Sequence, residues 1–146
     1  YWPQLVLGLT FNWGILVVSA EYIGGISLQL FLLYIACIFW TLGYDTIYAY
    51  QDREDDIRIK LKSTAVLFGK KGKSFVKIFY SLFIFSILVL TNLKKFYLLE
   101  SLILISFLIG LLIFLNKWNI DSNLSSNNYF KNNNLLGLII FLFLSF

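Results

Sequence analysis

The chain has 146 residues, of which 59% are hydrophobic, 19% aromatic and only 14% charged, and this composition excludes an ordinary soluble domain. It contains no histidine and one cysteine, which excludes a Ser-His-Asp triad, histidine-ligated zinc and an intrachain disulfide. The net charge of +4 does not indicate nucleic-acid binding, because the basic residues lie in loops between apolar runs. The composition therefore predicts an integral membrane protein that contacts the lipid bilayer.

Five apolar runs predict an all-α, multi-pass transmembrane helical bundle with about five membrane-spanning helices. We expect these helices, within a single membrane domain, at about residues 4–20, 28–50, 75–93, 96–116 and 133–146. The first run begins after Pro3, which suits the first turn of a helix. Its polar members, Gln4 and Asn12, predict interhelical hydrogen bonds, and contact with a substrate is the alternative.

The last apolar run, Leu135–Phe146, has twelve residues and is too short to cross a bilayer. Either its helix begins earlier, within the asparagine-rich stretch Ser122–Asn134, or the chain has been cut. The chain also contains no methionine, so we expect a fragment or a trimmed product.

Ten of the twelve Lys and Arg residues lie in two segments, Arg53–Lys77 and Lys117–Lys131. If the five helices alternate in direction, these segments fall on one side of the membrane and the other two basic residues on the opposite side. Basic residues concentrate in cytoplasmic loops. The sequence therefore predicts cytoplasmic loops at about residues 51–74 and 117–132.

Five of the eight acidic residues lie between Asp45 and Asp56. If this segment continues as a helix at about 100° per residue, Asp45, Asp52 and Asp56 share a stripe about 40° wide. Stacked carboxylates repel one another, and they are costly near hydrocarbon. A bound divalent cation would relieve this repulsion.

Basic and hydroxyl side chains lie within the acidic segment and directly after it: Arg53, Arg58, Lys60, Lys62, Ser63 and Thr64. Magnesium bound by few carboxylates is completed by phosphate oxygens, and nearby cations take up the remaining phosphate charge. The mixture therefore predicts a magnesium–diphosphate site at the edge of an apolar bundle. The alternative is a solvated loop in which the cations only orient the protein in the membrane.

Tyr44 to Asp56 reads Tyr-Asp-Thr-x-Tyr-Ala-x-x-Asp-Arg-x-Asp-Asp, and Lys-Ser-Thr-Ala and Phe-Gly follow at Lys62 and Phe68. This pattern resembles the second aspartate-rich motif of the UbiA superfamily of intramembrane prenyltransferases, and within it the branch that prenylates 4-hydroxybenzoate. Trp2–Gly8, Phe130–Asn134 and Gly137 are similar to that branch in the same order. The resemblance thus covers essentially the whole chain.

The resemblance implies a helical bundle around a cavity that opens sideways to the bilayer, with two aspartate-rich motifs facing each other. In this family Mg2+ held by both motifs binds the diphosphate of a polyprenyl diphosphate. The allylic cation then alkylates 4-hydroxybenzoate ortho to its hydroxyl, a step of ubiquinone biosynthesis. The implied membrane is the bacterial inner membrane, or the mitochondrial one in a eukaryote, with the active-site loops on the cytoplasmic or matrix side.

Carried onto this sequence, the resemblance makes Asp52 and Asp56 the metal ligands of the second motif. It makes Asp45 a helper in metal binding or acceptor orientation, and Lys62 and Arg53 the diphosphate-binding residues.

Two features depart from the family pattern. Lys60 stands where the family usually has glycine, and the first motif, Asn-Asp-x-x-Asp, does not occur in this chain. The chain is therefore expected to be the C-terminal part of a roughly nine-helix enzyme, inactive without its N-terminal half. The alternatives are a related prenyltransferase with a naphthoate or homogentisate acceptor, and a non-catalytic membrane fragment or remnant.

Overall fold

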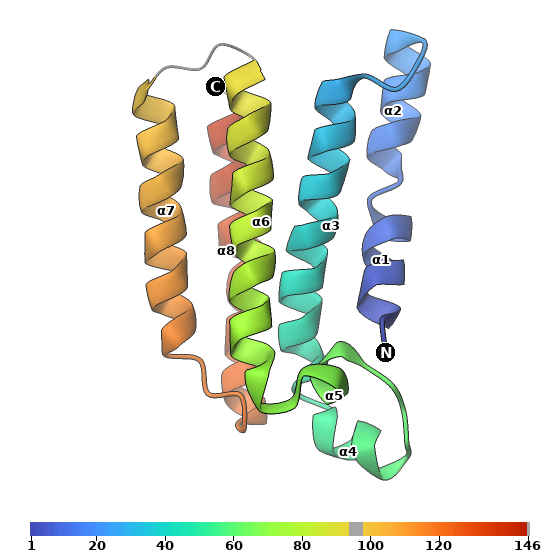
Figure 1. Ribbon diagram of the computed structural model, residues 1–146, viewed down its shortest axis with the longest axis vertical. Coiled ribbons are helices and arrows are strands. Elements are labelled where there is room, and N and C mark those ends of the chain that lie inside the picture. The colour runs from blue at the N-terminus through green and yellow to red at the C-terminus, as the bar shows by residue number, and fades with distance from the viewer. Residues whose placement is uncertain (94–97, 146) are drawn as a thin grey trace.

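The computed structural model describes residues 1–93 and 98–145, and within these ranges it is all-α, without strands. The long helices stand side by side, and two short helices close one end of the bundle (Figure 1). The elements are α1 (Pro3–Phe11), α2 (Gly14–Ile23), α3 (Leu28–Ala49), α4 (Arg53–Arg58), α5 (Thr64–Phe68), the 3-10 turn η1 (Gly69–Lys71), α6 (Gly72–Leu93), α7 (Leu98–Asn116) and α8 (Asn123–Ser145). We call the end that holds residues 50–72 and 117–122 the loop end.

Four helical segments of the described chain are long and apolar enough to cross a membrane: 3–23, 28–49, 64–93 and 98–116. The expected all-α membrane bundle is confirmed, but the expected fifth run, at residues 133–146, is not among these four. That run lies in α8, which begins at Asn123, where Ser122 Oγ accepts a hydrogen bond from Ser125 N at 3.2 Å. The helix therefore begins within the asparagine-rich stretch, and residues 123–132, expected in a loop, are helical.

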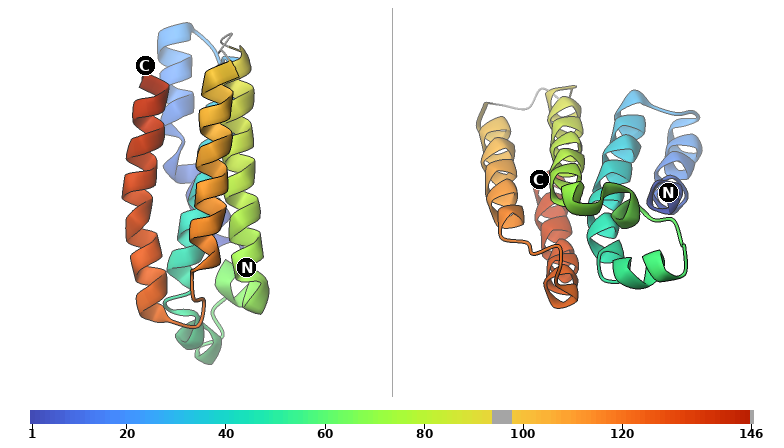
Figure 2. Two further views of the ribbon diagram at one scale, coloured as in Figure 1. Left: turned by 90° about the vertical axis from the view of Figure 1, so that its left-hand side faces the viewer. Right: turned by 60° about the horizontal axis from the view of Figure 1, so that its bottom comes forward.

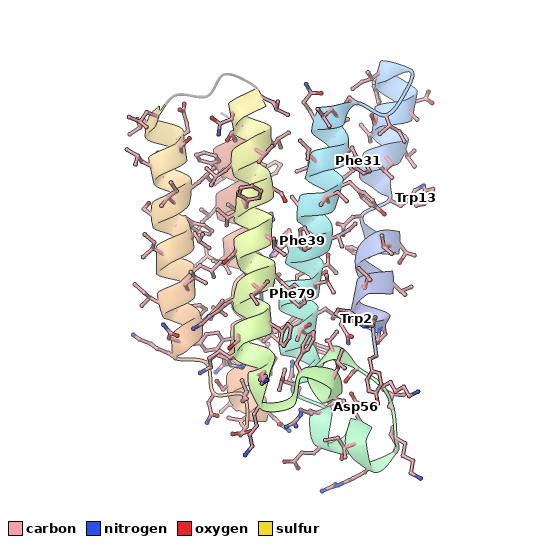
Figure 3. All side chains as sticks on the ribbon, viewed as in Figure 1. Trp2, Trp13, Phe31, Phe39, Asp56 and Phe79 are labelled. Atoms are coloured by element: carbon pink, nitrogen blue, oxygen red, sulfur yellow. The ribbon has the colours of Figure 1, made fainter. Side chains whose placement is uncertain are left out.

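The first apolar run, expected as one helix at about 4–20, is two helices that meet at Asn12 and Trp13. The side chain of Asn12 donates to Gly8 O at 2.8 Å and to Thr41 Oγ1 of α3 at 3.0 Å. These bonds hold the break against α3, and Trp13 points away from the bundle (Figure 3). The expected interhelical hydrogen bond of Asn12 is confirmed.

Helices α3 and α6 form the centre of the bundle, with buried residues along both. A Cβ built on Gly43 would lie 3.1 Å from the Tyr80 ring, and one built on Gly72 would lie 1.8 Å from Tyr50 Oη. The two glycines thus let rings from one helix lie directly against the backbone of the other. This contact, which we call the α3–α6 seam, fixes how α3 enters the loop end.

Candidate metal and diphosphate site

The acidic segment does not continue as one helix, because α3 ends at Ala49 and α4 begins at Arg53. The expected three-carboxylate stripe on a continuous helix is therefore wrong in its geometry. Asp45 stays on α3, whereas Asp52 precedes the first residue of α4 and Asp56 lies one turn later. In the described residues no group of three or more His, Cys, Asp and Glu side chains is arranged to hold a metal ion.

Asp56 is the buried member of the acidic segment, and it lies at the loop end (Figure 3). The hydroxyl of Ser63, itself buried, donates to Asp56 Oδ2 at 2.8 Å. Ser63 Oγ also accepts a hydrogen bond from Val66 N at 3.4 Å and caps α5. Since this capping bond occupies a lone pair of the hydroxyl, its proton is directed to the carboxylate. The carboxylate is thereby fixed through Oδ2. Its other oxygen, Oδ1, accepts no hydrogen bond from the described residues.

A second set of buried hydrogen bonds ties α5 to the bundle. Thr64 Oγ1 and Thr46 Oγ1 lie 2.9 Å apart, and the backbone N–H of Thr64 donates to Gln4 Oε1 at 3.1 Å. The expected hydrogen bond of Gln4 to a neighbouring helix is confirmed. Helices α1, α3 and α5 are thus fixed relative to one another next to Asp56. We call residues 50–68, together with Gln4 and Thr46, the acidic corner. It lies where α1, α3, α4 and α5 meet at the loop end (Figure 2, right).

Arg53 and Lys62 lie in the same corner, and neither forms an ion pair with a carboxylate of the described residues. Arg53 Nε donates to Ala65 O at 3.2 Å, and its guanidinium lies 5.8 Å from the centre of the Tyr50 ring. Lys62 Nζ lies 5.4 Å from the centre of the Tyr1 ring. In the described residues the ion pair present is Arg58–Asp55, which is exposed and joins Nη1 to Oδ1 at 3.2 Å.

Tyr50, at the end of α3, connects that helix to the residues that follow α5. Its hydroxyl donates to Gly69 O at 2.5 Å, and burial raises its pKa to about 12. The phenol therefore remains a hydrogen-bond donor at neutral pH.

The backbone at Lys60 explains the glycine that the family pattern has there. Lys60 has a φ of 57°, Leu61 N donates to Asp56 O at 2.8 Å, and Lys60 N donates to Ile57 O at 3.2 Å. These two bonds form a Schellman motif, in which the residue after the helix takes the left-handed conformation that glycine adopts most easily. The tight turn after α4 is kept with lysine in this position.

A cavity of about 490 Å³ lies between the end of α1, α3 and α8. Its lining is mainly aromatic and amide: Phe11, Asn12, Trp40, Thr41, Tyr44, Phe130, Asn133, Asn134 and Gly137. The family resemblance implied a cavity, but the sequence did not predict this set of lining residues, because they come from three distant segments. A signal for an aromatic lining was available in Trp40 and Tyr44, which lie one helical turn apart, with Tyr44 directly before Asp45.

Together these features define an integral membrane protein of the helical-bundle class with a buried, hydrogen-bonded carboxylate, that of Asp56, at one end. Residues 1–142 match the model of the UbiA prenyltransferase family, and the chain belongs to this family.

The chain is similar to curated proteins called 4-hydroxybenzoate octaprenyltransferase. It is 37% identical to one from Francisella tularensis subsp. mediasiatica over 96% of this chain and 49% of the relative. It is also 37% identical to one from Hahella chejuensis over 97% of this chain and 47% of the relative. With one from Pseudomonas fluorescens it shares 52% identity over 69 residues, which are 47% of this chain and 23% of the relative. The chain thus spans about half the length of the relatives that match nearly all of it, and no solved structure matches it.

Proposed function

We propose that this chain provides the second aspartate-rich motif of a magnesium-dependent 4-hydroxybenzoate polyprenyltransferase. The observation that carries the proposal is the fixed Asp56 carboxylate, one turn from Asp52, in a chain that matches about half the length of relatives that carry that name. The reaction would transfer a polyprenyl group from polyprenyl diphosphate to the ring of 4-hydroxybenzoate.

The residues of the acidic corner fit part of a magnesium site. Magnesium prefers carboxylate oxygens and binds through one or two carboxylates plus substrate phosphate oxygens. Asp52 and Asp56 offer such oxygens one helical turn apart, and Oδ1 of Asp56 accepts no hydrogen bond within the described chain. When bound, Mg2+ would neutralise charge on the diphosphate as it leaves the prenyl group.

Arg53 and Lys62 would bind the oxygens of the diphosphate. Neither has a carboxylate partner in the described residues, and Arg53 is already held in the corner by Ala65 O and the Tyr50 ring. Asp45, half-buried on α3 next to Tyr44, would help to bind metal or orient the acceptor.

The aromatic cavity would receive the reacting carbons. The bond between the prenyl carbon and the diphosphate oxygen breaks, the ring carbon ortho to the hydroxyl attacks, and the displaced ring proton leaves to solvent. The faces of Trp40, Tyr44 and Phe130 would stabilise the positive charge on the allylic group, as aromatic rings stabilise cations.

The rest of the site would come from the other half of the enzyme. Because the chain covers 49% of the relative from Francisella tularensis subsp. mediasiatica, we assign the opposing aspartate-rich motif and the acceptor carboxylate site to the uncovered part. We place the protein in the inner membrane with the loop end on the cytoplasmic or matrix side, because seven of the twelve basic residues lie within residues 50–72 and 117–122 of that end.

Prenyl transfer by membranes that contain the full-length protein tests the proposal. We expect Mg2+-dependent product, with turnover reduced about a hundredfold or more in Asp52→Asn and Asp56→Asn. Asp55→Asn is the matched control, because Asp55 is exposed and paired with Arg58, and we expect its turnover to stay within about twofold. Unchanged turnover in both site variants would refute the assignment, and preference for a naphthoate or homogentisate would correct the acceptor.

A further inference from the structure

A second polar cavity, of about 550 Å³, lies at the loop end between the start of α6 and the segment that follows α7. Lys70, Lys73 and Lys117 line it, and Asp121 contributes a single negative charge. Lys71 and Lys77 belong to the same stretch of η1 and α6. We call this region the lysine corner; it lies outside the helices of the acidic corner.

The lysines of this corner converge with only one carboxylate, that of Asp121, among the described residues that line the cavity. Lys73 Nζ donates to Asn116 O at 3.0 Å, and Lys77 Nζ donates to Asn116 Oδ1, so one residue holds two ammonium groups close together. In residues 1–93 and 98–145 none of the lysines forms an ion pair, and Asp121 has none either. Cations held together in this way repel one another and favour a bound anion.

The position of the cavity favours the headgroup of a lipid over a free anion. Asn116 ends α7, whose apolar segment is long enough to cross a membrane, so the cavity lies where that segment meets water. Trp118, completely buried in the lining, donates from Nε1 to Ser126 Oγ at 3.1 Å. This bond holds the wall of the cavity against α8.

An apolar track leads from the cavity along α6. Ser74 lines the cavity, and Ile78, Leu82 and Phe85 follow it at spacings that keep all four on one face of the helix. The three apolar side chains are exposed, by 50%, 37% and 63%. An acyl chain could lie along this track while its phosphate lies among the lysines.

We infer that the lysine corner binds an anionic phospholipid, with its phosphate at Lys70, Lys73 and Lys117 and one acyl chain along α6. Basic pockets at the ends of transmembrane helices bind anionic headgroups, and each nearby lysine contributes to the affinity. This site does not depend on the proposed prenyl transfer, since none of its residues belongs to the acidic corner.

Native mass spectrometry of the full-length protein in detergent, titrated with phosphatidylglycerol or phosphatidylcholine, tests the inference. We expect phosphatidylglycerol to remain bound and phosphatidylcholine to dissociate. We expect K73Q/K117Q to weaken phosphatidylglycerol binding about tenfold or more, since two lysine charges are lost. The matched control R58Q/K60Q removes two charges at the same end of the bundle but outside the cavity, and should change the affinity less than about twofold.

Three results would overturn the inference: equal retention of both lipids, equal loss in the two double variants, or displacement of the lipid by millimolar inorganic phosphate, which would indicate a free-anion site. If K73Q/K117Q does not fold, photo-crosslinking of the unsubstituted protein decides. A photoreactive phosphatidylglycerol should label peptides within 70–85 and 116–121, and labelling elsewhere alone would contradict the site.

Discussion

The α3–α6 seam and the acidic corner are neighbours, but different forces hold them together. In the seam, rings lie against glycine backbone at Gly43 and Gly72, so packing leaves no room for one more carbon. In the corner, Ser63, Thr64, Gln4 and Thr46 use hydrogen bonds to hold a carboxylate and a short helix. The difference shows that the seam determines whether the bundle forms, while the corner determines where Asp56 lies.

The largest effect on stability is expected from Gly72→Ala in the seam. A Cβ at this position would overlap the Tyr50 hydroxyl, which must then move and lose its hydrogen bond to Gly69 O. We expect the free energy of unfolding to fall by about 3 kcal/mol, as measured by denaturation in mixed micelles. Gly110→Ala is the matched control: a Cβ on this glycine of α7 meets nothing within 4 Å. It should be neutral or stabilise the helix by about 0.5–1 kcal/mol, and equal losses in both variants would refute the seam.

An intermediate effect is expected from Ser63→Ala in the acidic corner. Loss of the cap and of the bond to Asp56 should cost about 1–2 kcal/mol of stability. If Asp56 binds magnesium, the half-saturating Mg2+ concentration for prenyl transfer should also rise at least about threefold, and Ser63→Thr should restore it. Ser27→Ala is the matched control, because Ser27 caps α3 through Leu30 N at 3.2 Å but bonds to no carboxylate. Ser27→Ala should lower the free energy of unfolding without changing the half-saturating Mg2+ concentration. If both variants raise that concentration equally, Ser63 does not position Asp56 for magnesium.

The smallest effect is expected from Lys60→Gly at the end of α4. The left-handed backbone at Lys60 costs about 1 kcal/mol, and glycine relieves it while gaining entropy in the unfolded chain. The free energy of unfolding should therefore stay the same or rise by up to about 1 kcal/mol. Lys131→Gly, a matched change within α8, should lower it by about 1 kcal/mol. If Lys60→Gly lowers the free energy of unfolding as much as Lys131→Gly does, the turn after α4 does not need a left-handed residue.

The sequence predicts well what depends on neighbouring residues. Apolar runs predict α3, α6 and α7. The expected helix 28–50 ends within one residue of α3, but the stripe of three aspartates assumed a helix that continues, whereas the helix stops at Ala49 and a new one begins at Arg53. The start of α8 at Asn123 was left open, because its polar first turns carry no apolar periodicity.

Apart from the interhelical hydrogen bonds of Gln4 and Asn12, the contacts between distant segments were not predicted from the sequence. The partner of Asp56, Ser63, stands seven residues later and caps another helix. The aromatic cavity joins Asn12, Tyr44 and Asn133. The left-handed turn at Lys60 was indicated in the sequence only because the family pattern has glycine at this position. Such features depend on how helices pack, which periodicity within one helix does not specify.

The break between α1 and α2 bears on how the protein enters the membrane. Neither half-helix, of nine and ten residues, can cross hydrocarbon alone. The carbonyl of Leu9, freed near the end of α1, accepts a hydrogen bond from Tyr34 of α3 at 2.8 Å, and Asn12 reaches Thr41 of the same helix. Because exposed backbone is costly in lipid, residues 3–23 become stable there only once α3 lies beside them. We therefore expect α1, α2 and α3 to insert into the bilayer together, as one hairpin.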